Sequence, residues 1–288
     1  MTLLYIYWDF DPQVIPGSSI PVRWYGIMFA MAFVVAYLIM KRIFSKEGIP
    51  LKTLDDLTLW VGVGTVVGAR LGHCLFYEPE IYLREPLRIL KIWEGGLASH
   101  GAAIGILLAL WLFTRKYKYS FVGFLDRLAI VIPLSGAFIR LGNLANSEIY
   151  GKVTSLPWGF YFQRSLDFPH RFEPHHPTQI YEALAYILIT LLLWQLYRRN
   201  HDAKKGFLFG LFLTLLFVVR FLIEFVKEPQ VAFEQEMVLN MGQWLSIPFI
   251  VAGLVILVLS FRSNAGTDQA KVEAGEHNKS EEEGSSGV

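Results

Sequence analysis

Residues 27–40 read IMFAMAFVVAYLIM, a run in which apolar side chains cover every face of a helix. Six more apolar blocks follow, and at 1.5 Å per residue a block of about 20 residues spans about 30 Å of hydrocarbon. A membrane β-barrel would instead show short segments of alternating polarity. The sequence therefore predicts an all-α polytopic membrane protein with about seven spans. These are Ile20–Met40, Leu57–Tyr77, Gly95–Phe113, Phe121–Leu141, Gln179–Tyr197, Gly206–Val226 and Gln243–Phe261.

Composition supports a membrane protein and excludes several other classes. Of the 288 residues 53% are hydrophobic and 18% are charged, whereas soluble domains carry about 25% charged residues. Cys74 is the only cysteine, which excludes a disulfide framework and any zinc or iron–sulfur site built on several thiols. The net charge of +1 gives no case for nucleic acid. The pair His175 and His176 lacks further spaced ligands, so we assign no metal, and we expect no cofactor.

Basic residues set the predicted orientation. They follow the first, third and fifth blocks, which places these loops in the cytoplasm and the N-terminus outside. The aromatic-rich stretch 147–176 is then a small external, periplasmic cap on a membrane domain of residues 1–262. Residues 263–288 hold six acids and two lysines and have too little apolar content to fold, which predicts a disordered acidic cytoplasmic tail.

Ionisable groups inside membrane spans are costly and by default mark function. In the predicted orientation one set of polar groups falls on the external side. Several arginines at that depth favour a site for a phosphate or carboxylate, because guanidinium stays charged and binds such anions bidentately. The set comprises Tyr25, Arg70, His100, Arg140, Glu182 and Arg220.

Each of these features has a plainer interpretation as well. Arg220 and Glu224 are spaced i, i+4 and can pair on one helix face. Asn143, Asn146 and Glu148 follow Arg140 and suit either a polar ligand or a helix cap. The imidazole of His100 suits a general base or a hydrogen bond to a neighbouring helix.

Two other features point to structure. Asp126 and Arg127 lie near the cytoplasmic end of their block, where snorkelling or a local ion pair explains them. Gly64, Gly68 and Gly72 form a small-residue ridge, and Gly101 with Gly105 forms another. Such ridges predict close contacts between helices.

Seven ordered motifs resemble those of the bacterial prolipoprotein diacylglyceryl transferases, from Trp24 to Pro248. The most characteristic is Arg140–Gly151, RLGNLANSEIYG. The others are Trp24–Gly26 (WYG), Gly68–Gly72 (GARLG), Trp93–Gly101 (WEGGLASHG), His176–Glu182 (HPTQIYE), Arg220–Glu224 (RFLIE) and Met241–Pro248 (MGQWLSIP).

This resemblance implies an enzyme of the bacterial inner membrane. It would transfer the diacylglyceryl group of phosphatidylglycerol to the lipobox cysteine of a prolipoprotein, forming a thioether and releasing glycerol phosphate. His100, Arg140 and Arg220 match the positions on which the family's activity depends. Its other site positions match Tyr25, Asn143, Glu148, Gly151 and Glu224, with Arg70, Asn146 and Glu182 as possible support. The implied partners are phosphatidylglycerol, prolipoproteins and the lipid bilayer.

Two other classes remain as alternatives. A transporter for an anionic solute also uses intramembrane arginines, but it often has internal repeats and a midplane site, and neither is evident here. A structural or interaction protein needs fewer embedded charges. The choice of general base, between His100 and a carboxylate acting with it, stays open.

Overall fold

The computed structural model describes residues 5–17, 22–92, 95–96, 98–166, 171–199, 204–228 and 237–262. They form two compact units. One unit comprises residues 37–125, and the other comprises the residues up to 36 together with those from 126 onward. The predicted tail, residues 263–288, lies outside the described residues, as do Ile20 and Phe168. The domain spanning residues 1–262 stays a prediction.

Six helices within the described residues are long and apolar enough to cross a membrane, as an all-α multi-pass protein requires. They are α1 (Trp24–Lys46), α2 (Leu51–Phe76), α5 (Phe121–Ala145), α6 (Thr178–Arg199), the segment Phe207–Val226 and the helix Met241–Arg262. The fifth contains α7 (Phe207–Ile223) and the 3-10 helix η4 (Glu224–Val226). The predicted third span coincides with α4 (Ser99–Tyr117), which is not among the six, so the count of seven stays a prediction.

Several helices are longer than the apolar blocks that predicted them. The helix α1 continues past Met40 to Lys46, and α2 begins at Leu51 rather than Leu57. A helix keeps its backbone hydrogen bonds through polar flanking residues, whose charged ends reach the headgroups and water. An apolar block therefore marks the buried length of a span and not the ends of its helix.

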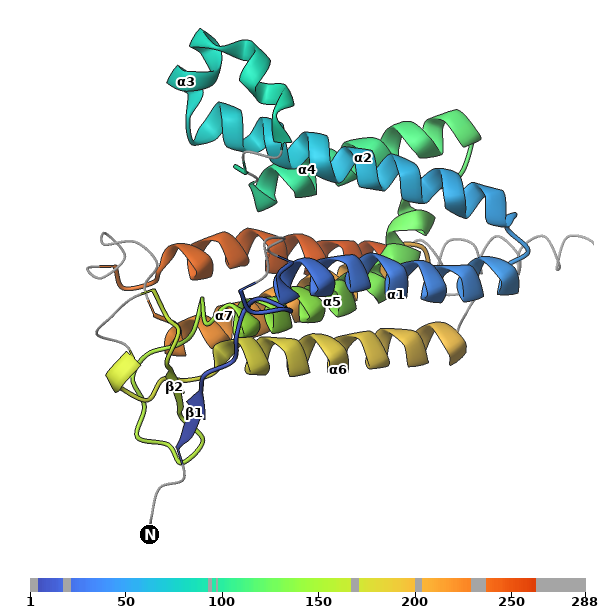
Figure 1. Cartoon of the computed structure of the whole chain (residues 1–288). Coiled ribbons are helices and arrows are strands. Elements are labelled where there is room, and N and C mark those ends of the chain that lie inside the picture. Colours follow the sequence, from blue (N-terminus) through green and yellow to red (C-terminus); the bar gives the residue numbers. More distant parts are fainter. Residues whose placement is uncertain are drawn as a thin grey trace, which may run out of the picture. The chain divides into compact units, whose positions relative to one another are not determined.

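The unit of residues 37–125 is built on α2 and α4, which run side by side (Figure 1). Between them, α3 (Pro79–Arg84) and the 3-10 helix η1 (Pro86–Leu90) form the connection. The predicted glycine ridges meet here. A Cβ on Gly68 would overlap the carbonyl oxygen of Gly101, and a Cβ on Gly105 would overlap that of Gly64. The close contact between these two helices is thus confirmed, and it requires residues without side chains.

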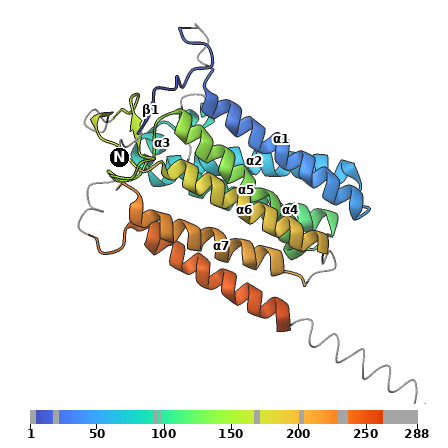
Figure 2. The same ribbon diagram turned by 90° about the horizontal axis from the view of Figure 1, so that it is seen from below.

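In the other unit, α7 lies beside the helix Met241–Arg262 (Figure 2). A Cβ on Gly210 would stand 2.9 Å from the carbonyl oxygen of Gly253, so this pair also packs closely. Asp126 of α5 accepts hydrogen bonds from the backbone of Gly206 (2.7 Å) and Phe209 (2.9 Å). It therefore caps the N-terminus of α7. This capping role is one that the sequence did not predict.

The stretch 147–176 packs together with the N-terminal segment. The strand β2 (Phe160–Phe162) pairs in parallel with β1 (Ile6–Trp8), as Figure 1 shows, with Trp8 opposite Phe162. A buried cluster, against which Trp8 packs, is formed by Leu144, Tyr150, Phe160 and Phe162. The aromatic residues of this stretch therefore pack, as the sequence indicated, but Trp158 stays half exposed. The external location of the stretch 147–176 stays a prediction.

The glycine contact gives a stability prediction. Replacing Gly68 with Ala places a methyl group against the Gly101 backbone, so we expect α2 and α4 to separate slightly at a cost of about 1–3 kcal/mol. Thermal unfolding in detergent measures this as a lower Tm. Gly62→Ala, on the same helix, is the matched control, because a Cβ there meets nothing within 4 Å. Equal melting of the two variants would contradict the contact.

Candidate active site

The end of α5 carries the polar residues of the Arg140–Gly151 motif. Nδ2 of Asn143 donates to Oε1 of Glu148 (2.9 Å), and Nδ2 of Asn146 donates to the same oxygen (3.2 Å). Nη1 of Arg140 makes a longer hydrogen bond to Oδ1 of Asn143, at 3.4 Å. The two amide groups thus bind the carboxylate rather than cap the helix. The structure favours the interpretation in which these residues build a polar site.

Glu148 stands in a turn with an unusual backbone. Ser147 has φ 55° and Ile149 has φ 58°, a left-handed conformation that is rare for a β-branched residue. Two side chains at the start of α6 hold the turn. Thr178 Oγ1 donates to the carbonyl of Ile149 (3.1 Å), and Gln179 Nε2 donates to that of Glu148 (2.8 Å). Both side chains are fully buried, so the turn is fixed from inside the protein.

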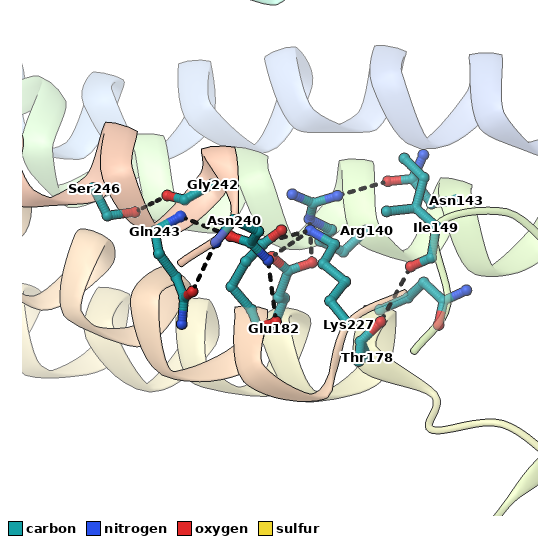
Figure 3. A network of polar contacts seen from close by, with 12 residues as sticks. Arg140, Asn143, Ile149, Thr178, Glu182, Lys227, Asn240, Gly242, Gln243 and Ser246 are labelled. Atoms are coloured by element: carbon teal, nitrogen blue, oxygen red, sulfur yellow. Dashed lines mark hydrogen bonds and ion pairs between the residues drawn. The ribbon is translucent and has the colours of Figure 1, made fainter. Parts of the chain in front are cut away.

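A buried ion network lies beside this turn (Figure 3). Nε of Arg140 contacts Oε2 of Glu182 at 2.7 Å, and Nζ of Lys227 contacts Oε1 of Glu182 at 3.6 Å. Lys227 also lies 3.6 Å from Oε2 of Glu224. Glu182 is fully buried, and Lys227 is 2% exposed. Charges so far from water are stable only when they are paired, so these four groups depend on one another.

Lys227 is the residue of this network that the sequence prediction missed. It directly follows the last apolar residue of its block, where a lysine is normally a membrane-flanking charge. Its spacing of i, i+3 from Glu224 is the one signal for a pair. Burial lowers its pKa; Glu182 and Glu224 oppose this shift, whereas Arg140 and Arg220 add to it.

Arg220 differs from Arg140 in its ion pairs within the described part of the chain. Among the described residues no carboxylate lies within ion-pair distance of it, and its side chain is half-buried. The i, i+4 pair with Glu224 is therefore wrong, because Lys227 binds that carboxylate instead. A guanidinium at this depth without an internal counter-ion is suited to an external anion.

Glycines bring the chain close to this network. Gly151 forms an antiparallel bridge with Lys227, and a Cβ on Gly151 would overlap the carbonyl oxygen of Val226. A Cβ on Gly242 would stand 2.7 Å from Oε1 of Glu224. On α5, a Cβ on Gly142 would stand 2.8 Å from the ring of Tyr25. The predicted residues Tyr25 and Gly151 thus belong to the unit that contains Arg140 and Arg220.

His100 belongs to the other unit, in the first turn of α4. Its Nε2 is 2.8 Å from the hydroxyl of Tyr77, the residue after α2, and the two rings are nearly parallel. His73 stacks on Tyr77 in turn. The predicted hydrogen bond to a neighbouring helix end is therefore confirmed. His100 is also exposed, so the same residue keeps the accessibility that a base needs.

Arg70 is used inside the protein. It is 2% exposed and donates to the carbonyl oxygens of Ile89 (3.0 Å) and Arg88 (2.6 Å), and also to those of Gly95 and Gly96. Its guanidinium lies over the ring of Tyr82, 5.0 Å from the centroid. Arg70 thus fixes the connection that precedes α4, which is support for His100 rather than a contact for a ligand.

Comparison with known proteins places this geometry in a family. Residues 12–259 match the family described as prolipoprotein diacylglyceryl transferase. The chain belongs to the prolipoprotein diacylglyceryl transferase family. A relative from Tolumonas auensis is 50% identical over 90% of this chain and 99% of its own length. For relatives from Porphyromonas gingivalis and Chloroherpeton thalassium the identities are 44% and 40%, over 91% of this chain and 98% and 96% of their own lengths.

These three relatives are named phosphatidylglycerol–prolipoprotein diacylglyceryl transferase. The resemblance inferred from seven motifs is therefore confirmed for the whole membrane part of the chain. The diacylglyceryl transferase motifs contribute to both units. Residues of Arg140–Gly151, His176–Glu182 and Arg220–Glu224 contribute to the ion network and to the turn beside it, whereas Gly68 and Gly72 pack against Gly101, the residue after His100.

Proposed function

We propose that the protein transfers the diacylglyceryl group of phosphatidylglycerol to the lipobox cysteine of prolipoproteins, the first step of lipoprotein maturation. Family membership supports the reaction. The observation that carries it is Arg220, a half-buried guanidinium that has no carboxylate partner among the described residues and belongs to the same unit as the Arg140 network. A phosphodiester lipid supplies the anion that such a group requires.

In this reaction the cysteine sulfur attacks the glycerol carbon next to the phosphate. The carbon–sulfur bond forms while the carbon–oxygen bond breaks, and the electron pair leaves on the phosphate oxygen, giving glycerol phosphate. Arg140 and Arg220 hold the phosphate and stabilise the charge that develops on the leaving group. Tyr25, Asn143, Glu148 and Gly151 shape the polar wall of the same site.

The thiol must lose its proton, because an unperturbed cysteine has a pKa near 8.5. Two of the candidate carboxylates, Glu182 and Glu224, are buried and already bound to cations. The exposed imidazole of His100 is the better acceptor, with Tyr77 fixing the ring through its hydrogen bond. We therefore assign the role of general base to His100.

The proposed location is the bacterial inner membrane, with the N-terminus outside, the C-terminus in the cytoplasm and the site toward the periplasm. Basic residues at the ends of α1, α4 and α6 support this orientation. Such a site receives the lipid laterally from the outer leaflet and the precursor after its export. A transferase site at this location also explains the charges embedded in the spans, so these charges do not require the alternative function of anion transport.

The reaction is tested with purified protein in detergent, phosphatidylglycerol and a synthetic lipobox peptide. We expect the peptide to gain the mass of a diacylglyceryl group together with an equal amount of released glycerol phosphate. A peptide with serine in place of cysteine is the control and should stay unmodified. Folded protein that yields neither product with several lipids and peptides would overturn the proposal.

Arg220→Lys tests the phosphate contact. Lysine keeps the charge but lacks the bidentate fork of arginine, so we expect kcat/KM to fall by about 10²-fold, as on loss of a transition-state donor. Arg199→Lys, an exposed change in the last turn of α6, is the control and should retain full activity. Unchanged kcat/KM in Arg220→Lys would exclude the bidentate role.

His100→Ala tests the base. Without the imidazole we expect turnover at pH 7 to fall by about 10²- to 10⁴-fold. The deficit should narrow toward pH 9, because the peptide thiol then ionises without help. The measurement is the pH profile of kcat/KM for variant and wild type. Full turnover at pH 7, or a deficit that is equal at all pH values, would remove this role from His100.

A further inference from the structure

Lys227 is the one cation of the ion network that the proposed phosphate site does not use. Its side chain is 2% exposed, and no solvent compensates its charge. Nζ lies 3.6 Å from one oxygen of Glu182 and 3.6 Å from one oxygen of Glu224. A lysine that is this deeply buried destabilises the fold unless its ion pairs offset the cost of removing its charge from water. Its presence therefore needs a different explanation from that of a charged residue at the end of a membrane span.

The charges around Lys227 suggest that explanation. Lys227 shares Glu182 with Arg140, and it is the cation that binds Glu224. Without Lys227, Glu224 would have no cation within ion-pair distance among the described residues. The pairing of Glu224 therefore depends on a residue that does not need to touch the phosphate.

The sequence spacing and the observed ion pairs show which cations the two carboxylates would bind if Lys227 were absent. Glu224 follows Arg220 by four residues, a distance at which helical side chains meet. In the structure Glu224 is bound by Lys227 and not by Arg220. Glu182 divides its two oxygens between Arg140 and Lys227. Loss of the lysine would release Glu224 toward Arg220 and leave Glu182 to Arg140 alone.

Backbone hydrogen bonds restrict the position of Lys227. Lys227 pairs with Gly151 in an antiparallel bridge, and the backbone amide of Lys152 donates to the carbonyl of Val226 at 2.8 Å. Because Gly151 has no side chain, the two segments can approach this closely. The turn after η4 is therefore anchored on the same segment that carries Glu148.

We propose that Lys227 is a positioning residue: by binding Glu224 it keeps that carboxylate from pairing with Arg220, which stays free to bind the phosphate of the substrate lipid. This inference rests on the proposed function, since it concerns the phosphate site of that reaction. It gives Glu224 a role as the counter-ion of Lys227, and Gly151 a role in placing the lysine.

The test compares ligand binding by folded variants, with glycerol phosphate as the probe. In Lys227→Met we expect its Kd, measured by calorimetry in detergent, to rise by at least about tenfold, since a freed carboxylate now competes for the arginine. The KM for phosphatidylglycerol should rise with it. Lys152→Met is the matched control. Nζ of Lys152 donates to the carbonyl of Phe225 on the same bridge, but Lys152 is exposed and binds no glutamate among the described residues.

A double variant separates the effect of a freed Glu224 from simple loss of structure. Lys227→Met with Glu224→Gln removes the lysine and its carboxylate partner together, so no carboxylate at position 224 is freed to compete for Arg220. We expect it to bind glycerol phosphate within about threefold of Glu224→Gln alone, because the coupled pair has been removed as a unit. This comparison decides the proposal even if Lys227→Met by itself does not fold.

The outcomes are distinct. If the double variant is folded and still binds glycerol phosphate much more weakly than Glu224→Gln, Lys227 acts through something other than its contact with Glu224. If Lys227→Met is folded and binds like the wild type, the lysine is merely structural. In either case, a wild-type protein that forms product still supports the proposed transferase reaction. A wild type that neither binds glycerol phosphate nor forms product would instead refute the proposed function itself.

Discussion

Glu182 is fully buried, and its two oxygens bind two different cations, Arg140 and Lys227. A carboxylate in a medium with so little water keeps its charge only through such partners. The constraint extends outward from this residue. Arg140 fixes the end of α5, Lys227 fixes the turn after α7, and Glu182 itself fixes α6. Three membrane-spanning segments thus meet at one shared carboxylate.

The remaining polar groups can be ordered by how much of their bonding capacity the protein uses. Arg70 donates to four backbone carbonyls, whereas Arg140 uses Nε to bind Glu182 and Nη1 to bind Asn143. Arg220 has no carboxylate partner among the described residues. A series of this kind separates structural from ligand-binding arginines better than depth in the membrane does, because all three lie in apolar surroundings.

Glycine governs how near the segments come. In the unit of residues 37–125 it allows α2 and α4 to meet backbone to backbone, which places the helix that begins just before His100. In the other unit, Gly151 admits the turn that carries Lys227, and Gly242 admits the carboxylate of Glu224. A side chain at any of these positions would move a charged group, so the same residue type serves both packing and chemistry.

The sequence by itself determined the helical membrane class, the glycine contact between α2 and α4, the family and most of the polar residues around the site. These follow from local patterns: apolar length, small-residue spacing and ordered motifs. Tertiary structure alone decided which charges pair. Arg220 and Glu224 share the ideal helical spacing, yet Glu224 binds Lys227, because the turn after α7 and its bridge to Gly151 bring the lysine within reach. Spacing along a helix makes an ion pair possible, but the pair that forms depends on which buried, oppositely charged group lies nearest in three dimensions.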